Sequence, residues 1–410
     1  MAEANGQVRL RKVFYLPGYD PFPPRRYREI YRAEAALQGA VSGHRIEVSR
    51  SPDLGATGWR VAARVEGRDV AAEIRVLVWS DLVKTSMGRG IAATYVQLAR
   101  TVRVYVGSGA IFRVARLRKG PTIAALYPVA ALLVELALAV LAAVLAGSVA
   151  GALPGGPAGT ALGLAIGAAV LAGLLVLFRR LDRSLYTHYL MHDYAYSAGG
   201  QGAYPAELSD RLTRFTALVA EALDGTADEV LVVGHSSGAY LAVTVLADLI
   251  RSGRAVPSQG TALSLLTLGH VVPMVSFLPK AERLRGDLAF LSARSDLTWV
   301  DVTAPGDGCA FALCDPVAVS GVAPAGKRWP LVISAAFSQT LSPERWRALR
   351  WRFFRLHFQY VHAFDRPGDY DYFAITAGPR TLADRFDGRA PSPSRVETPL
   401  SPYISTAAAR

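Results

Sequence analysis

Residues 230–243 read VLVVGHSSGAYLAV and place a serine between two glycines at the end of an apolar run. The run VLVV predicts a buried strand, and the small and aliphatic residues after the second glycine predict a helix. This is the setting in which the pattern G-x-S-x-G presents a serine as a nucleophile. Gly234 and Gly238 leave room where a Cβ would collide with the neighbouring strand or helix. We therefore expect Ser236 to stand above a sheet at the positive end of a helix dipole, the alternative being a turn without chemistry.

Apolar runs and amphipathic segments surround this stretch and predict an α/β fold with a central sheet flanked by helices. The further predicted strands are 8–16, 44–50, 57–64, 73–80, 262–268, 298–303 and 330–336, and the main predicted helices are 25–38, 210–223 and 343–362. One large domain of this kind fits within 410 residues.

Two long apolar segments account for a mean hydropathy of +0.23. Residues 122–146 contain one charged residue, Glu135, and one proline, Pro128, and residues 161–178 contain no charge. Because about 20 helical residues cross the hydrocarbon core of a bilayer, these lengths predict a transmembrane hairpin. The Gly- and Pro-rich stretch 147–160 between them predicts a reversal.

Basic residues flank the hairpin on both outer sides and are missing from its link: Arg113, Arg116, Arg118 and Lys119 before it, and Arg179, Arg180 and Arg183 after it. The positive-inside rule then predicts an inner-membrane protein with both termini in the cytoplasm. We expect one cytoplasmic domain in two parts, 1–120 and 181–386, interrupted by the hairpin at 121–180. The Pro- and Ser-rich tail 387–410 is expected to be disordered. Gly163 and Gly167 are spaced for close packing of the two spans.

The net charge of +12 suits an anionic partner. No nucleic-acid-binding motif accompanies it, so the membrane is the expected partner and nucleic acid is not. Two cysteines, Cys309 and Cys314, are too few for a disulfide framework and agree with a reducing compartment. The first twelve residues lack the apolar core of a signal peptide.

A serine hydroxyl becomes a nucleophile when a histidine takes its proton and a carboxylate orients that histidine. GHSSG, between its strand and helix, resembles the nucleophile turn of the α/β-hydrolase superfamily, in particular its lipases and esterases. The resemblance covers the cytoplasmic parts, not the hairpin, and implies the chain order serine, acid, histidine. It points to Asp307, which follows strand 298–303 between Gly306 and Gly308. The alternatives are a turn role for this residue, Asp301 within the strand, and Asp315 before a proline.

The implied base lies downstream of the acid, which leaves His357 and His362 as candidates. We choose His357, because aromatic residues flank it and could line an acyl pocket; a continuous helix over 343–362 would weaken both choices. His270 precedes Asp307 and breaks the order. His235 lies inside the turn and is expected to point away from the pocket.

The resemblance also implies an oxyanion hole formed by two backbone N–H groups. One belongs to the residue after the nucleophile, Ser237, and the other to Tyr19, in the loop after the first predicted strand. Gly18 permits the close approach that this loop needs. A turn role for residues 17–19 is the alternative.

Two other patterns carry less weight. His188 and His192 share a helix face, but no HExxH motif or third ligand accompanies them, so we expect neither metal nor cofactor. Residues 345–360 interleave five arginines with aromatic residues. That pattern fits a helix at the headgroup boundary of an anionic leaflet or, equally, an ordinary helix with aromatics in the core.

The sequence thus predicts a membrane-anchored serine hydrolase that cleaves a small acyl ester or thioester, with a lipid as one substrate class. Two alternatives stay open: an inactive hydrolase fold that serves as a membrane scaffold, and an acyltransferase that uses the same three residues.

Overall fold

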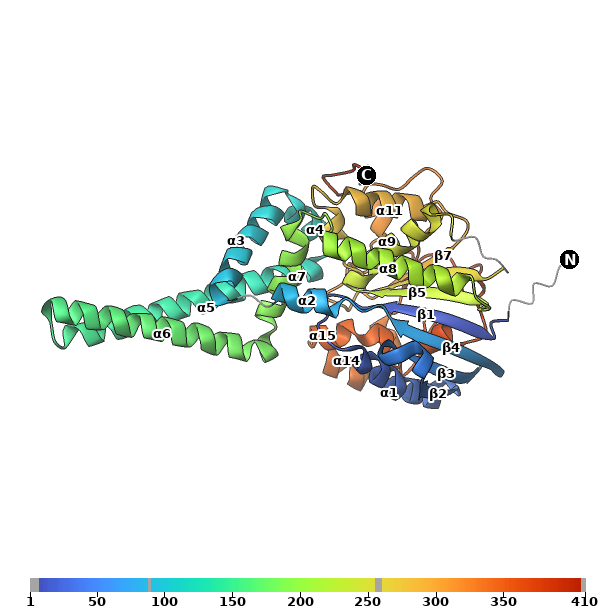
Figure 1. Cartoon of the computed structure of the whole chain (residues 1–410), viewed down its shortest axis with the longest axis horizontal. Helices are drawn as coiled ribbons and strands as arrows, with labels where there is room; N and C mark the ends of the chain where they lie inside the picture. The colour runs from blue at the N-terminus through green and yellow to red at the C-terminus, as the bar shows by residue number, and fades with distance from the viewer. Residues whose placement is uncertain (1–6, 88–89, 255–259, 407–410) are drawn as a thin grey trace.

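The computed structural model describes residues 7–87, 90–254 and 260–406. It is an α/β protein with one eight-stranded mixed sheet flanked by helices, from one end of which two long helices project (Figure 1). The sheet order is β2-β3-β4-β1-β5-β6-β7-β8, antiparallel between β2, β3 and β4 and parallel elsewhere. The strands are β1 Leu10–Leu16, β2 Arg45–Arg50, β3 Gly58–Val65, β4 Arg68–Val76, β5 Glu229–His235, β6 Ala262–Leu268, β7 Thr298–Thr303 and β8 Leu331–Ser334.

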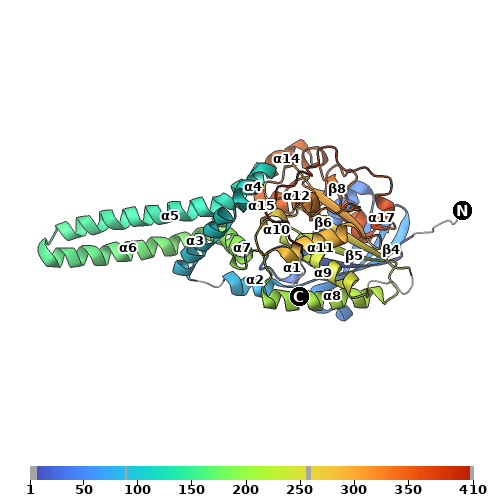
Figure 2. The same ribbon diagram turned by 90° about the horizontal axis from the view of Figure 1, so that it is seen from above.

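Helices cover both faces of the sheet (Figures 1 and 2). They are α1 Pro24–Ser42, α2 Ser80–Met87, α3 Ile91–Gly107, α4 Ala110–Leu117, α5 Lys119–Ala152, α6 Gly156–Leu185, α7 Thr187–Gly199, α8 Ala206–Leu223, α9 Ser237–Arg251, α10 Pro273–Ser276, α11 Glu282–Ser292, α12 Pro316–Val319, α13 Phe337–Thr340, α14 Pro343–Leu349, α15 Phe353–His357, α16 Tyr372–Ala377 and α17 Leu382–Arg385, with 3₁₀ turns η1 Pro52–Thr57 and η2 Gln359–Val361.

The central strand β5 is buried on both faces, as its uninterrupted apolar run requires. Val230 and Val232 enter the core beneath α8, α9 and α11. Leu231 and Val233 enter the opposite core, with α1, α16 and the segment around η2. The strand order places the end of β5, and the serine after it, near the middle of the row formed by the carboxyl ends of the parallel strands.

The predicted strands correspond to strands of the structure with small shifts at their ends, except that β4 begins at Arg68 and not at residue 73. Glu66 and Gly67, both with positive φ, form the two-residue turn that joins β3 to β4. Such a turn starts the second strand at once, and the charged residues Glu66, Arg68 and Asp69 hide that start from a hydrophobic pattern.

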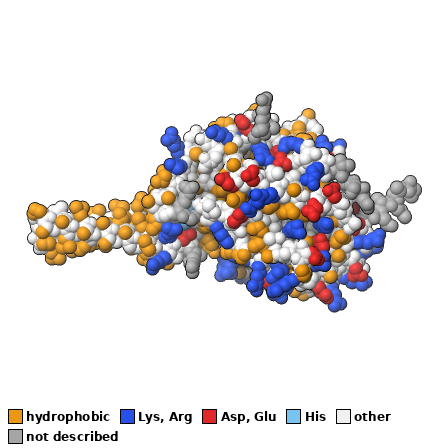
Figure 3. Space-filling model, in the orientation of Figure 1, with side chains coloured by type: hydrophobic (Ala, Val, Ile, Leu, Met, Phe, Trp, Pro, Cys, Tyr) orange, Lys and Arg blue, Asp and Glu red, His pale blue; other side chains and the backbone are white. Residues whose placement is uncertain are grey.

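The hairpin is longer and its reversal shorter than the sequence predicts. Helices α5 and α6 are both long and apolar enough to cross a membrane, and little of either is buried; their apolar surface is the orange rod of Figure 3. The glycines assigned to a link instead pack helix on helix: a Cβ on Gly147 would lie 2.6 Å from the carbonyl oxygen of Gly163, and one on Gly151 would lie 2.9 Å from that of Gly159. Missing side chains permit this approach, so residues predicted to break the helices hold them together.

The first half of α5 packs against the rest of the protein. Leu132 contacts Leu98 of α3 and Met191 of α7 in a small apolar cluster. Glu135 is 7 % exposed on the same side of α5 and interacts electrostatically with His188 of α7. A carboxylate that the sequence places in mid-span is therefore covered by protein, which removes it from lipid.

The expectation that the C-terminal tail is disordered is wrong. Residues 387–406 are not a detached tail, because backbone N–H groups of Ser392, Val396 and Leu400 donate to carbonyl oxygens of Val332, Leu313 and Val319 at 2.9, 2.7 and 3.0 Å. A Pro- and Ser-rich composition does not reveal such partners in distant segments of the chain. Residues 407–410 lie outside the described chain.

The predicted helix 343–362 is three short pieces, α14, α15 and η2, broken at residues 350–352. Its apolar side chains point in different directions, with Trp346 against Gly306, Phe354 against Tyr186, and Leu356 in the core. One straight helix could not make all three contacts.

Candidate active site

Ser236 occupies a strained turn between β5 and α9. Its backbone has φ 57° and ψ −121°, a conformation that costs free energy in a non-glycine residue and recurs at functional sites. Its N–H donates to the carbonyl oxygen of Leu268 at 2.9 Å. A Cβ on Gly234 would lie 2.6 Å from the carbonyl oxygen of Gly238, and one on Gly238 would collide with that of Leu16. Both glycines are therefore required by contact distances.

Asp307 and His357 form a buried hydrogen-bonded pair, 2.7 Å between Oδ2 and Nδ1. Asp307 follows β7 and His357 is the last residue of α15, after β8, so both lie at the sheet edge where β5 ends. Asp307 also accepts hydrogen bonds from the Cys309 N–H at 2.9 Å and the Tyr360 hydroxyl at 3.0 Å. Burial raises the pKa of Asp307, but the charge of His357 and these hydrogen bonds outweigh it, and the pKa lies below its ordinary value. This carboxylate is held ionised.

The imidazole lies close to the serine turn. A Cβ on Gly269 would lie 3.2 Å from His357 Cε1, and Gly269 directly follows the residue that accepts the Ser236 N–H. Within the described residues no hydrogen bond joins Ser236 Oγ to His357. In unliganded enzymes this bond is often long and tightens when substrate binds.

His235 supports the backbone of His357. Its Nε2–H donates to the His357 carbonyl oxygen at 3.0 Å, and the two rings lie 4.9 Å apart. Burial and the nearby charge of His357 lower the pKa of His235 to about 3, so the ring is neutral. The sequence predicts that His235 points away from the pocket. In the structure its ring packs beside the His357 ring, and its hydrogen bond holds the His357 backbone in position.

The loop after β1 approaches the serine closely. A Cβ on Gly18 would lie 2.9 Å from Ser236 Cβ, so any larger residue would displace the serine. The next residue, Tyr19, is held by a hydrogen bond between its hydroxyl and Ser86, and its carbonyl oxygen accepts from the Tyr189 hydroxyl of α7. Ser237 is the first residue of α9, where the N–H has no acceptor within the helix. The geometry brings both backbone segments expected of an oxyanion hole to Ser236.

The second candidate for the base, His362, lies elsewhere. His362 Nδ1 is 2.7 Å from the carbonyl oxygen of Phe358, and Nε2 is 3.9 Å from Glu34. This histidine anchors the segment to α1 and does not contact Asp307.

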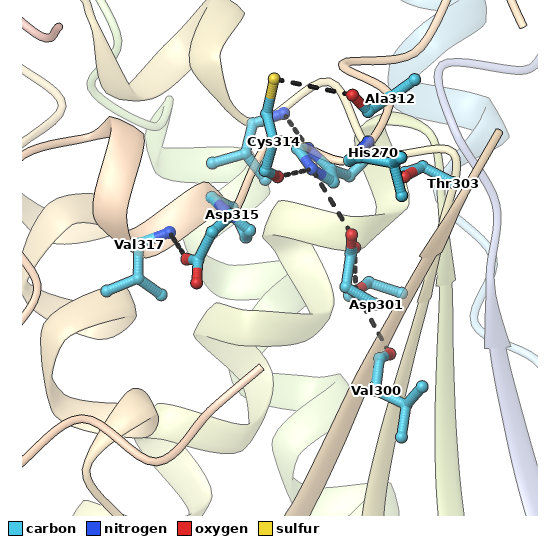
Figure 4. A network of polar contacts seen from close by, with 12 residues as sticks. His270, Val300, Asp301, Thr303, Ala312, Cys314, Asp315 and Val317 are labelled. Atoms are coloured by element: carbon cyan, nitrogen blue, oxygen red, sulfur yellow. Dashed lines mark hydrogen bonds and ion pairs between the residues drawn. The ribbon is translucent and has the colours of Figure 1, made fainter. Parts of the chain in front are cut away.

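His270, Asp301 and Asp315 form a separate buried network (Figure 4). His270 donates from Nε2 to the Cys314 carbonyl oxygen at 2.9 Å, and the same nitrogen lies 3.7 Å from Asp301. Burial lowers the pKa of His270 to about 4, so it is a neutral donor. Asp315 caps the N-terminus of α12 through its side chain. These residues hold the far end of the loop that carries Asp307.

Asp307, Cys309 and His357 each place one ligand atom within 4.8 Å of the others, so a metal ion could be held here among the described residues. Two of the three already bind each other. His188 and His192, which the sequence places on one helix face, lie on α7 and are buried.

Sequence reasoning missed Tyr360 and Asp193. Tyr360 lies three residues after His357, close enough in sequence to have suggested it. Asp193, on α7, interacts electrostatically with His357 and Cys309. Burial raises its pKa to about 7, against a smaller opposite effect of His357. Nothing near Asp193 in the sequence marks it, because α7 meets the site only in the folded chain.

Comparison with protein-family models, curated proteins and solved structures gave no match. The chemistry of this site therefore has to be inferred from its own residues.

Replacing Asp193 with asparagine is expected to stabilise the protein at pH 8. The folded pKa of about 7 lies above the usual carboxyl value, so between those values the folded state holds a proton that the unfolded state has lost. The cost to the wild type grows as pH rises from about 4 to 7 and is then constant; with a discount for partial exposure we expect a gain of about 2 kcal/mol at pH 8. Denaturant unfolding in detergent at pH 8 and pH 5 measures it. Asp224→Asn, on an exposed carboxylate, is the control; an equal effect of Asp193→Asn at both pH values would contradict the prediction.

Proposed function

We propose that this chain is a serine hydrolase of the α/β-hydrolase type that cleaves an ester or thioester through an acyl-enzyme. The observation that carries the proposal is the buried 2.7 Å hydrogen bond between Asp307 and His357, beside the strained turn of Ser236. An ionised carboxylate that orients an imidazole next to a glycine-flanked serine is an arrangement with a known chemical use. The order serine, acid, histidine along the chain also fits.

In this mechanism Ser236 Oγ attacks the acyl carbon while His357 Nε2 takes its proton. Asp307 holds the Nδ1–H tautomer and stabilises the imidazolium that forms. The N–H groups of Tyr19 and Ser237 stabilise the oxyanion. His357 then protonates the leaving alcohol or thiol. A water molecule deprotonated by the same imidazole attacks the acyl carbon, the bond to Ser236 Oγ breaks as His357 returns the proton to that oxygen, and the acid is released.

The proposed location is the inner membrane, with α5 and α6 crossing the bilayer and both termini in the cytoplasm. Support comes from the length and exposure of the two apolar helices and from the basic residues at their outer ends. A substrate with an acyl chain dissolved in that membrane is the proposed class.

The second candidate is an inactive fold that serves as a membrane scaffold, which would need no hydrogen bond between Ser236 and His357; within the described residues there is none. Turnover separates the two. The full chain in detergent is assayed with acyl p-nitrophenyl esters and acyl thioesters of increasing chain length. We expect hydrolysis that depends on Ser236, and no turnover on any substrate would favour the scaffold. A competing alcohol in the same assay detects the third possibility, because an acyltransferase would form the new ester in preference to free acid.

A further inference from the structure

The segment Arg350–Arg355, reading RWRFFR, joins α14 to α15 and forms a basic and aromatic surface, called here the RWRFFR surface. Trp351 is 72 % exposed and Phe353 is 48 % exposed, values unusual for such large apolar side chains. Arg350, Arg352 and Arg355 are exposed as well.

The three arginines of this surface form no ion pair with any residue that the structure describes. The two arginines just before it differ: Arg345 lies 3.2 Å from Asp365, and Arg347 lies 3.2 Å from Glu344. An exposed guanidinium without a carboxylate can bind a phosphate group through two parallel hydrogen bonds. The segment thus combines apolar side chains without a core and cations without a counter-ion.

The RWRFFR surface lies near both ends of the hairpin. The ring of Phe354 lies 4.4 Å from that of Tyr186, the residue after α6. Phe353 lies against Gly308, and Gly308 contacts Gly120 in the first turn of α5. Lys and Arg side chains lie where the apolar rod meets the body (Figure 3). Lys119 begins α5, Arg179 and Arg180 lie near the end of α6, and all three are exposed.

The apolar side chains of the arginine-rich segment are divided between the interior and the surface. Leu356 enters the core and Phe354 packs on Tyr186, while Trp351 and Phe353 face outward. A helix serving only the core would bury its largest side chain. If α5 and α6 cross a bilayer, the outward side chains lie at headgroup depth, where tryptophan and arginine are favoured.

We propose that the RWRFFR surface binds the anionic phospholipid headgroups of the leaflet from which the hairpin enters, with Trp351 and Phe353 inserted among the acyl chains. Phe353 contacts the residue after Asp307, and His357 ends the same short helix. Lipid bound here therefore lies beside the Asp307–His357 pair. The inference rests on the proposed membrane anchoring; binding of lipid by this surface needs no hydrolase activity.

Quenching of tryptophan fluorescence by brominated acyl chains tests the inference. The full chain is reconstituted into vesicles of brominated phosphatidylcholine, with or without phosphatidylglycerol, and wild type is compared with Trp351→Phe. We expect much of the quenched signal to disappear in Trp351→Phe. Trp329→Phe is the matched control and should leave the quenched signal unchanged. Trp329 lies just before β8, at the amino ends of the parallel strands, whereas Asp307 and His357 lie at their carboxyl ends.

The charge requirement is tested with the triple variant Arg350→Gln, Arg352→Gln, Arg355→Gln. In anionic vesicles we expect at least about a twofold loss of Trp351 quenching, and in neutral vesicles little change. The same variant should hydrolyse an ester embedded in anionic vesicles more slowly, with unchanged rates on a water-soluble ester.

Four results would overturn the inference or separate it from the proposed function. Unchanged quenching in Trp351→Phe would show that this side chain does not enter the bilayer. Trp351 quenching that is the same with and without phosphatidylglycerol, and the same in the triple arginine variant, would overturn headgroup binding. Failure of the protein to float with vesicles would overturn the anchoring and this inference together. An inactive protein with the expected quenching would overturn the proposed function alone and support the lipid surface.

Discussion

Ser236→Ala is expected to abolish hydrolysis and covalent labelling by a fluorophosphonate probe. Loss of the nucleophile of a serine triad lowers kcat by about a million-fold. Alanine removes only the oxygen, and the strained turn is held by glycines on both sides, so the fold should survive. Labelling of the purified chain, with the modified residue located by mass spectrometry, measures the result.

The neighbouring serine provides the matched control. Ser237 is proposed to act through its backbone N–H, which Ser237→Ala retains, so this variant should still be labelled and should keep most of its activity. Labelling that persists in Ser236→Ala would assign the nucleophile to another residue. Absence of labelling in the wild type, together with absence of turnover, would favour the scaffold.

His357→Ala is expected to lower activity by about as much, because removing the base of such a triad costs nearly as much as removing the nucleophile. His357 is the histidine that contacts Asp307, at 2.7 Å. His362→Ala, five residues on, should retain activity within about fivefold, since an effect transmitted only through packing is commonly of order 1 kcal/mol. Rates of ester hydrolysis for the two variants decide the base.

Unfolding midpoints of both variants serve as the control, because His235 also contacts the His357 carbonyl oxygen. That contact is made by the backbone and survives in His357→Ala. Loss of activity in His362→Ala with retention in His357→Ala would show that the resting contacts of Asp307 do not identify the base.

Much of the site is predictable because its determinants are local. The residues that allow φ 57° at Ser236 lie within two positions of it, and the apolar strand before them is enough to bury β5. The two apolar spans are likewise evident from composition over windows of about 20 residues. The position of Asp307 after a strand followed from chain order in a superfamily that the turn resembles.

Other features depend on contacts between distant segments. His357 and His362 lie in one short segment and have similar neighbours, so the sequence pattern alone distinguishes them poorly as candidates for the base. The break at residues 350–352 and the burial of Tyr360 decide which ring meets Asp307, 50 positions earlier. Asp193 enters the site only because α7 returns from the hairpin to the sheet edge. The glycines of 147–160 show the same limit, since whether a glycine ends a helix or packs against another depends on its neighbour in space.

The sequence by itself determined the strained turn at Ser236, the alternation of strands and helices, and the apolar hairpin. Each of these is a property of consecutive residues, set by backbone conformation or by length and hydropathy. Only the tertiary structure decided which histidine faces Asp307, that Glu135 is covered by α7, and that Trp351 and Phe353 lie outside the core beside the hairpin. These are decided by which surfaces exclude water together, and burial is a property of the assembled chain.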